Sequence, residues 1–499
     1  MKIKRNNTLY KWISVICMNI GILMLVSCEK DLEYVSYGDL NSIVQTPEGV
    51  EAAVSSAYTG LAGGSDWQGG WDAGTYSWRV QSMMTTDEGL CSWGGNWSRM
   101  HTLNFSPDFD WVTHNYSRYL PYISRIAIVL NDIENVDIDA GLKERFIAEL
   151  KALRAHYAQL LYFAYGPLTI ITDAEIAADP NYPPTPRPSA AEMVAQIEKD
   201  WIDAADVLPD RFSGNDYGRF SKAAALTGLM KLYMHEKQWA KAVSTGQQIK
   251  GQGYSLQPVY EDLFNINNKG GASSEIILAV VCTATGGDQY TNMWLAHALP
   301  GDYKDPSGIS LTAWGGYKMA WDAYDKFDPQ DKRLNVLLED YPVGKDEGGN
   351  VIYKNAREAG LIGAIPVKFG PDPSGANAQK SAVDFPIYRY ADVLLMLAES
   401  INEANGGPNT EAYDAINDVR ERAGLSSVPD GLSKEEFLSK VQDERLFELW
   451  AEGWRRDDLI RWNMYTQRAN AEPYSALYPL PRAAVNQSDG VIQQNPGYN

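Results

Sequence analysis

The stretch SKAAALTGLMKLYMHEKQWAKAVSTGQQIK, residues 221–250, decides the fold. Its apolar side chains recur at three- and four-residue spacing, which is the pattern of a helix with one buried face. A first stripe runs from Ala225 to Tyr233, and a second runs from Trp239 to Ile249. The polar residues between the stripes predict a turn. The stretch therefore predicts two helices that pack against each other, with small residues at the closest contacts.

The same spacing predicts further helices, at residues 146–165, 191–208, 388–405, 411–423 and 434–450. Residues 392–423 form a second pair around the break Gly406-Gly407-Pro408. Such pairs resemble tetratricopeptide repeats, but a regular period is absent, so we expect long insertions between them. Residues 274–281 are short and β-branched, which predicts one buried strand. The expected fold class is mainly α.

The N-terminus has the pattern of a lipoprotein signal. Basic residues precede an apolar stretch at 12–26, which is shorter than the roughly 17 residues that usually span a bilayer. That shortness argues against the alternative, an uncleaved anchor helix. The stretch closes with Leu25-Val26-Ser27-Cys28, and small residues before a cysteine are what lipoprotein processing uses. We predict a signal peptide at 1–27, lipidation at Cys28 and a tether at 28–45.

The net charge limits which partners the chain can bind, and the cysteine content limits which disulfides it can form. The chain has a formal net charge of −20, which argues against nucleic acid or an anionic lipid surface as its partner. No later apolar run approaches spanning length, so we expect a soluble body held by its tether. Beyond Cys28 only Cys91 and Cys282 remain, and spacing alone does not establish whether they form a disulfide.

Two loops rich in tryptophan and tyrosine, the first at residues 67–97 and the second at residues 290–321, carry the chemistry of sugar recognition. A sugar ring offers an apolar face that stacks on an aromatic ring, while its hydroxyls need amide, carboxylate or guanidinium partners. Residues 67–97 hold five of the 15 tryptophans, where an even spread would place about one. We predict exposed binding platforms in these loops, from Trp67, Trp71, Trp93, Trp97, Trp294, Trp314 and Tyr317, with hydrogen-bonding partners among Asp66, Arg79, Asp87 and Asn96.

The alternative is that such rings pack the loops onto the helical scaffold. This interpretation is stronger for Trp78 and Trp321 than for the others. Four tryptophans within helical stripes are predicted to lie in the core: Trp201, Trp239, Trp450 and Trp454.

Several motifs, read in order, resemble the SusD/RagB family. They are FIAELKALRAHY (146–157) ahead of YGP (165–167), PRPSAAE (186–192), GRFSKAA (218–224), DFPIYRYADVLLM (384–396), ERLFELWAEGWRRDDLIRW (444–462), YPLP (478–481) and QNPGY (494–498). With the cysteine motif at the N-terminus, the resemblance extends from Cys28 to Asn499.

The resemblance implies a mainly α-helical SusD-like domain over residues 46–499, with parts 46–270 and 271–499 forming one structural unit. Its tetratricopeptide-like helix pairs would be the scaffold, and an irregular half would present a shallow sugar site. Trp314-Gly315-Gly316-Tyr317 resembles a loop that lines this site in related receptors. Such proteins sit on the outer face of the outer membrane, as a lid over a SusC-like TonB-dependent transporter. The Glu29-Lys30-Asp31 segment resembles their acidic export tag.

Enzyme signatures are missing from the sequence. A nucleophile elbow, a zinc motif, a phosphate loop and a complete calcium loop are all absent, so we expect no catalytic residue, metal site or cofactor. Glu444, Glu448 and Glu452 are predicted to be structural, paired with Arg445, Arg455 and Arg456. Two alternatives to a glycan receptor stay open: a receptor for peptide or another nutrient, and, more remotely, a glycoside hydrolase.

Overall fold

The computed structural model describes residues 44–62, 69–285 and 290–498. Cys28, the predicted signal peptide and two predicted site residues, Asp66 and Trp67, lie outside the described residues. The helices are α2 (Pro47–Tyr58), α3 (Trp78–Met84), α4 (Asn96–His101), α5 (Asp110–Asp132), α6 (Ala140–Tyr165), α7 (Ala174–Ala178), α8 (Ala190–Val207), α9 (Lys222–His235), α10 (Trp239–Lys250), α11 (Trp294–Ala298), α12 (Trp321–Tyr324), α13 (Tyr390–Asn405), α14 (Thr410–Arg422), α15 (Lys434–Leu449), α16 (Arg455–Arg461), α17 (Tyr465–Arg468) and α18 (Arg482–Gln487).

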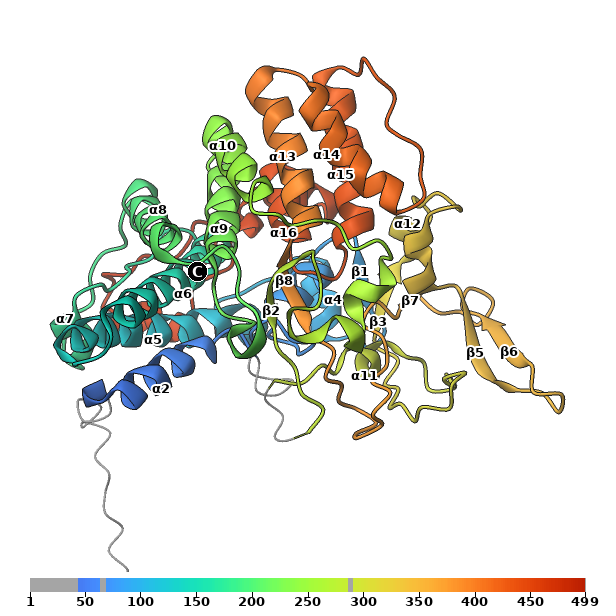
Figure 1. Ribbon diagram of the computed structural model, residues 1–499, viewed down its shortest axis with the longest axis horizontal. Coiled ribbons are helices and arrows are strands. Elements are labelled where there is room, and N and C mark those ends of the chain that lie inside the picture. The colour runs from blue at the N-terminus through green and yellow to red at the C-terminus, as the bar shows by residue number, and fades with distance from the viewer. Residues whose placement is uncertain (1–43, 63–68, 286–289, 499) are drawn as a thin grey trace, which may run out of the picture.

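The strands are short and form small antiparallel sheets. They are β1 (Gly89–Cys91), β2 (Ile276–Val280), β3 (Tyr317–Ala320), β4 (Leu337–Leu338), β5 (Asp340–Lys345), β6 (Val351–Asn355), β7 (Gly363–Pro366) and β8 (Phe385–Arg389). Strands β1, β3, β7 and β4 pair in that order, β2 pairs with β8, and β5 with β6 forms a hairpin. Figure 1 shows this hairpin projecting away from the helices.

The predicted helix pair is α9 with α10. Ser221 begins α9 by accepting a hydrogen bond from the backbone N–H of Ala224, at 3.3 Å, as a helix cap does. A β-carbon on Gly228 would lie 2.4 Å from the ring of Trp201, so this glycine lets α8 and α9 approach closely. Within the pair, a β-carbon on Gly246 of α10 would lie 2.8 Å from the Met230 side chain of α9, so a small residue stands at this close contact, as predicted.

The larger helices pack in series. Helix α6 contacts α5 and α8, α8 contacts α9, α10 lies against α9 and α13, and α13 packs on α14 and α15. Figure 1 shows this series running from the blue-green helices to the orange helices, with the strands and irregular loops below it. The mainly α architecture is confirmed, as are the predicted helices α6, α8, α9, α10, α13, α14 and α15 and the predicted strand β2.

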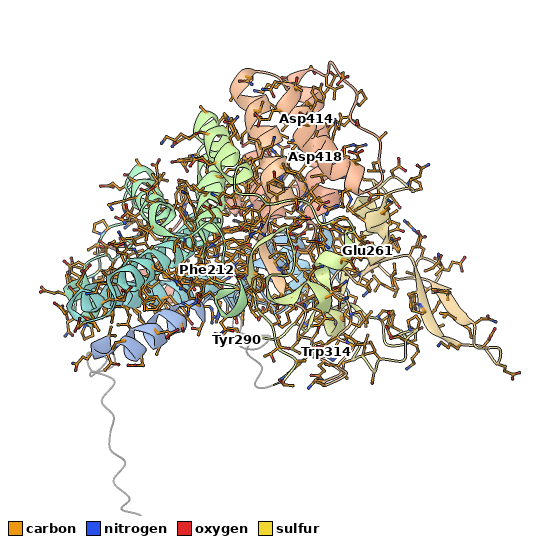
Figure 2. The ribbon with its side chains drawn as sticks, in the orientation of Figure 1. Phe212, Glu261, Tyr290, Trp314, Asp414 and Asp418 are labelled. Carbon is orange, nitrogen blue, oxygen red and sulfur yellow. The ribbon has the colours of Figure 1, made fainter. Side chains whose placement is uncertain are left out.

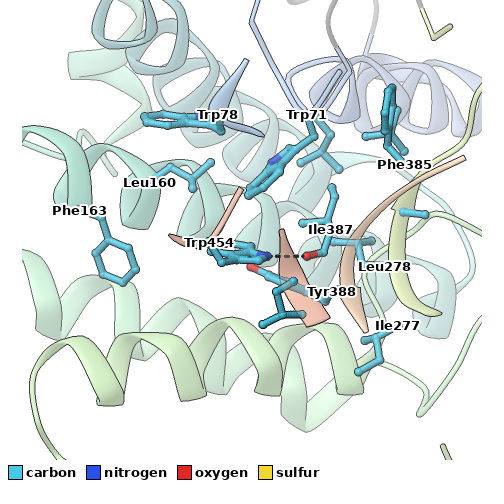
Figure 3. Packing of buried hydrophobic residues seen from close by; sticks show 14 of the residues in the cluster. Trp71, Trp78, Leu160, Phe163, Ile277, Leu278, Phe385, Ile387, Tyr388 and Trp454 are labelled. Atoms are coloured by element: carbon cyan, nitrogen blue, oxygen red, sulfur yellow. Dashed lines mark hydrogen bonds between the residues drawn. The ribbon is translucent and has the colours of Figure 1, made fainter. Parts of the chain in front are cut away.

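The core joins segments that lie far apart in sequence. Figure 3 shows Trp71 beside Trp454, and their ring centroids are 4.8 Å apart. The indole nitrogen of Trp454 donates to the carbonyl of Ile387 at 3.0 Å, and its ring stacks on Tyr388. Trp201, Trp450 and Trp454 are buried as predicted, and Trp239 is partly buried against the core.

The three glutamates of the C-terminal motif are structural, as predicted, and all are buried. Their predicted partners are wrong, because Arg445, Arg455 and Arg456 turn to other groups. The observed partners come from distant segments. Glu444 pairs with Arg333 and Arg420, and Glu452 pairs with Lys368 and Arg389. Glu448 pairs with Arg333, Arg389 and Arg422. Helix α15 ends before Glu452, so the four-residue spacing does not determine these pairs.

Among the described helices, none combines the length and apolar character that crossing a membrane requires.

Candidate functional site

Aromatic side chains from three segments meet at one point of the irregular half. Trp93 and Trp97 come from the β1–α4 loop and α4, and His297 comes from α11. Trp314 lies in the loop before β3, and Tyr317 is the first residue of β3. We call these five residues the aromatic cluster. Trp93 lies 5.8 Å from Trp97, 5.8 Å from Tyr317 and 5.9 Å from His297 between ring centroids, and His297 meets Trp314 edge-on at 4.8 Å.

Two members of the cluster reach the surface. Trp93 is 43% exposed, and Trp314 is half-buried. The indole N–H of Trp93 donates to the backbone carbonyl of Trp314 at 3.0 Å, which links the two loops. In Figure 2, Trp314 lies at the lower edge of the molecule, with Tyr290 nearby in the view. We call Trp93 and Trp314 the platform.

A glycine turn presents Trp93 to solvent. Gly94 and Gly95 both have positive φ, +65° and +58°, a conformation that glycine adopts without steric cost. Asn96 follows as the first residue of α4, and its side chain is exposed. No side-chain hydrogen bond of Asn96 is found within the described part of the chain, so its exposed amide is available to a ligand three residues after Trp93.

The ring of Trp93 lies directly over the backbone of the second loop. A β-carbon on Gly316 would lie 2.5 Å from that ring, so only glycine leaves room for the indole. Ser92 fixes the same contact, because its N–H donates to the Gly316 carbonyl at 3.0 Å and its hydroxyl donates to the Gly315 carbonyl at 2.7 Å. The geometry of Trp93 is therefore set by main-chain contacts.

Several predicted platform residues are buried, and the prediction that they are exposed is wrong. Trp71 and Trp294 are fully enclosed, and their indole nitrogens donate to His156 and to the Pro366 carbonyl. Tyr317 is enclosed as well, with its hydroxyl donating to the Ala73 carbonyl at 2.9 Å. These rings pack the loops onto the scaffold.

Trp97 is also a packing residue. It is only 7% exposed, and it meets Trp111 edge-on at 4.7 Å and Tyr317 at 5.5 Å. Its ring supports Trp93 from below rather than offering a free face. Trp78 is buried, as the packing interpretation predicts, and Trp321 is half-buried under the guanidinium of Arg357.

The two charged residues predicted to bind the sugar, Arg79 and Asp87, instead form hydrogen bonds within the fold. Arg79 is fully buried, and its guanidinium donates to the carbonyls of Trp71, Pro386 and Ala451. Burial lowers the pKa of Arg79 to about 10. Asp87 accepts two hydrogen bonds from Arg455. Burial opposes ionisation of this carboxyl, but Arg455 holds the pKa of Asp87 below its usual value. Both residues serve the fold.

Cys91 and Cys282 are free thiols in the structure, so the two are not bridged. Within residues 44–62, 69–285 and 290–498, no three His, Cys, Asp or Glu side chains gather as metal ligands would.

The cluster includes residues that the sequence analysis missed. His297 stacks on Tyr317 at 4.8 Å, and Lys318 lies buried beneath the second loop. A lone histidine and a lysine in a short strand carry no signal that distinguishes them from ordinary structural residues. What the site offers chemically is an exposed indole face, a half-buried indole and an adjacent amide, which suits stacking and hydrogen bonding.

Comparisons with known proteins agree on one family. A sequence model described as the SusD family matches residues 274–476, and one described as "Starch-binding associating with outer membrane" matches residues 48–234. The chain is 27% identical to SusD-like protein P25 of Formosa agariphila, over 61% of this chain and 64% of that protein. It is 24% identical to the starch-binding protein SusD of Bacteroides thetaiotaomicron, over 83% of this chain and 84% of that protein.

Solved structures share the fold. A SusD homologue from Bacteroides thetaiotaomicron superposes with a TM-score of 0.76 at 22% identity, covering 93% of this chain and all of that one. Surface glycan-binding protein A from the same organism, solved in complex with laminarihexaose, superposes with a TM-score of 0.72 at 21% identity, covering 90% of this chain and 99% of that one.

Proposed function

This chain belongs to the SusD/RagB family, and on that premise we propose that it is a cell-surface lipoprotein that captures an oligosaccharide and passes it to a SusC-like TonB-dependent transporter. In this proposal Cys28 carries the lipid anchor in the outer membrane, and the body faces the cell exterior. The protein binds and delivers its ligand without chemical change.

The observation that carries the proposal is the platform. Trp93 exposes 43% of its surface although it is held by four ordered contacts, with Trp314, His297, Tyr317 and Trp97. A large aromatic ring that is both exposed and fixed in place loses little entropy when a sugar stacks on it. Asn96 supplies an amide beside the ring for a hydroxyl group.

The position of the platform fits delivery to a membrane partner. In Figure 1 the chain enters the described fold at α2, on the lower side of the view, and Trp314 lies on the lower side of the same view in Figure 2. In the proposal, this side of the molecule faces the membrane. A glycan held there would face a transporter in that membrane.

The expected affinity is modest. A sugar that covers about 75 Å² of an indole face gains roughly 2 kcal/mol at ~25 cal/mol per Å². Two such contacts total roughly 4 kcal/mol, which corresponds to a dissociation constant on the order of 1 mM, before hydrogen bonds add to it and the cost of association is subtracted. A tethered receptor beside its transporter works at such affinity because the ligand stays locally concentrated.

A panel of polysaccharides tests the proposal. Soluble Cys28→Ala protein is expected to bind at least one neutral polysaccharide, and Trp93→Ala is expected to weaken that binding about tenfold or more. Tyr182→Ala is the matched control, because Tyr182 is 40% exposed and lies on the α7–α8 loop, outside the aromatic cluster. Equal binding by Trp93→Ala and the control would place the sugar site elsewhere, and binding to peptides alone would overturn the choice of ligand.

Membrane fractions test the anchor and the partner. The wild-type chain is expected in the outer-membrane fraction, and gentle detergent extraction should recover it with a large β-barrel transporter. Cys28→Ala should release the chain, because acyl chains supply stable attachment. Retention of Cys28→Ala in the membrane would contradict lipidation. Repeated recovery of the wild-type chain alone, from cells shown to express the transporter, would contradict the partnership.

A further inference from the structure

A buried lysine lies beneath the platform. Lys318, on β3, is 1% exposed, and its neighbour across the sheet is Leu90 of β1. A β-carbon on Gly363 of β7 would lie 2.9 Å from the β-carbon of Lys318, so the strands close over the base of this side chain. The ammonium group is thereby held inside the fold, under the second loop of the aromatic cluster.

All three N–H donors of this ammonium go to backbone carbonyls. Its acceptors are Ala298 at 2.8 Å, Tyr317 at 2.9 Å and Gly315 at 3.0 Å. Ala298 is the last residue of α11, so the lysine joins the end of that helix to the loop that carries Trp314. Among the described residues, no carboxylate pairs with Lys318.

The same loop is joined to α11 by its own backbone. The N–H of Trp314 donates to the Ala296 carbonyl at 2.7 Å, and the N–H of Gly315 donates to the Leu299 carbonyl at 2.8 Å. Gly315 is also the acceptor for Ser92, next to Trp93. The Gly315 carbonyl is thus shared between the lysine and the loop that bears the exposed indole.

We propose that Lys318 is a positioning residue for the platform, a buried ammonium that holds the Trp314 loop against α11 and makes glycan binding depend on its own protonation. The inference about binding rests on the proposed function, whereas the positioning of Trp93 and Trp314 does not. The Lys318 ammonium is stabilised by three backbone carbonyl groups and not by an ion pair with a carboxylate.

Loss of the proton would break this arrangement. A neutral amine has two N–H donors and one lone pair, so one of the three carbonyls would lose its donor and face the lone pair. An unsatisfied carbonyl in a buried position is costly, and the loop relaxes to reach water. Burial lowers the pKa of Lys318 to about 8, which brings this change near physiological pH.

Three titratable groups face Lys318 from the adjoining elements. Cys91 on β1 is the side chain whose charge would raise the pKa of Lys318, but burial raises the pKa of the Cys91 thiol to about 12. Tyr317 and His297 are the other titratable groups on the adjoining β3 and α11, and Tyr317 is fully buried. Cys91, Tyr317 and His297 are unchanged in Lys318→Met. A transition of the Trp93 and Trp314 signals that is lost in this variant therefore reports the protonation of Lys318.

Fluorine NMR of protein containing 5-fluorotryptophan tests the positioning without any ligand. The Trp93 and Trp314 signals are assigned with Trp93→Phe and Trp314→Phe. In the wild type both signals are expected to shift with a midpoint near pH 8. Lys318→Met is expected to show no such midpoint, and Lys304→Met, which changes an exposed lysine before the same loop, is expected to keep it.

Two results would overturn the proposal. One is a wild-type spectrum in which the Trp314 signal does not move between about pH 6.5 and about pH 9.5. The other is the same midpoint in Lys318→Met as in the wild type. If Lys318→Met does not fold, the wild-type titration still decides, because an unmoved Trp314 signal contradicts the proposal by itself.

Binding measurements then extend the test to function. With laminarihexaose, or with the polysaccharide that the panel identifies, wild-type affinity is expected to fall about tenfold between pH 7 and pH 9.5, while Lys318→Met binds weakly at both. Equal affinity of the wild type at both pH values would refute the link to binding. If nothing binds at any pH but the Trp314 signal titrates through Lys318, the proposed function fails and the positioning role stands.

Discussion

Arg333 and Glu444 form an ion pair at 2.7 Å in which both side chains are completely buried. The same guanidinium also contacts Glu448 at 3.0 Å and Asp331 at 2.7 Å. Burial opposes ionisation of the Glu448 carboxyl group. The charges of Arg422, Arg389 and Arg333 nevertheless hold the pKa of Glu448 well below its usual value. The charges that look like catalytic candidates in the sequence are thus neutralised inside the scaffold, where they join α15 to three other segments.

Arg333→Met is expected to destabilise the fold by about 3–5 kcal/mol, because it leaves buried carboxylates without their cation. Lys354→Met is the matched control, since it breaks an exposed pair with Asp302, which water screens, and is expected to cost far less stability. Chemical denaturation of both variants measures the difference. Similar small losses in the two variants would mean that the buried network contributes little net stability.

The two tryptophans of the first loop are expected to separate binding from stability. Trp97→Ala removes a buried ring and should cost about 3–5 kcal/mol of stability. Trp93→Ala removes a ring that is 43% exposed, so its thermal transition should stay closer to that of the wild type while glycan binding weakens about tenfold. Thermal unfolding and binding of both variants check this, and a Trp93→Ala variant that unfolds would identify Trp93 as structural.

Glu88 is expected to make stability fall as pH rises. Its carboxyl group is buried without a close hydrogen-bond partner among the described residues. Burial raises the pKa of Glu88 from 4.5 to about 8, against the opposing charge of Arg455. Between these values the unfolded chain releases the proton and the folded chain keeps it, so the stabilising contribution present below pH 4.5 is lost by about pH 8.

The variant Glu88→Gln removes this dependence. The free energy of unfolding of the wild type, relative to Glu88→Gln, should decline with a slope of at most about 1.4 kcal/mol per pH unit between these two pKa values. Denaturation of both proteins at several pH values measures the slope. A difference that stays constant across this range would show that Glu88 is ionised in the folded protein.

The helical scaffold was predictable because its signals are local. Ser189 and Glu192 form a reciprocal cap at the start of α8, and the apolar spacing that follows fixes the buried face. Helix α5 was missed because Pro121 and many polar residues interrupt its pattern, although packing on α6 keeps it helical. Local pattern thus identified the helices whose packing face is continuous in sequence.

The platform was predictable only in part. Clustering of tryptophans correctly drew attention to the first loop, yet Trp71 and Trp97 are buried there and Trp93 is exposed. What separates the buried rings from Trp93 is contact with other segments, such as Trp454 against Trp71 and Trp111 against Trp97. Composition carries no information about such contacts. Lys318 was missed for the same reason, because its acceptors become neighbours only when β3 meets α11.

Gly316→Ala is expected to weaken glycan binding without unfolding the protein. The added methyl group would lie 2.5 Å from the Trp93 ring, so the indole must move. Because that ring is exposed on its outer side, it can swing into solvent at little cost to the fold. Swinging out breaks its hydrogen bond to the Trp314 carbonyl and separates the two rings of the platform.

Gly301→Ala is the matched control, because a β-carbon at Gly301 would meet no other atom within 4 Å. We expect Gly316→Ala to lose about tenfold in affinity for the glycan, while Gly301→Ala binds as the wild type does. Titration calorimetry measures the affinities, and thermal unfolding confirms that both variants are folded. Undiminished binding by a folded Gly316→Ala protein would show that the placement of Trp93 over the second loop has no part in recognition.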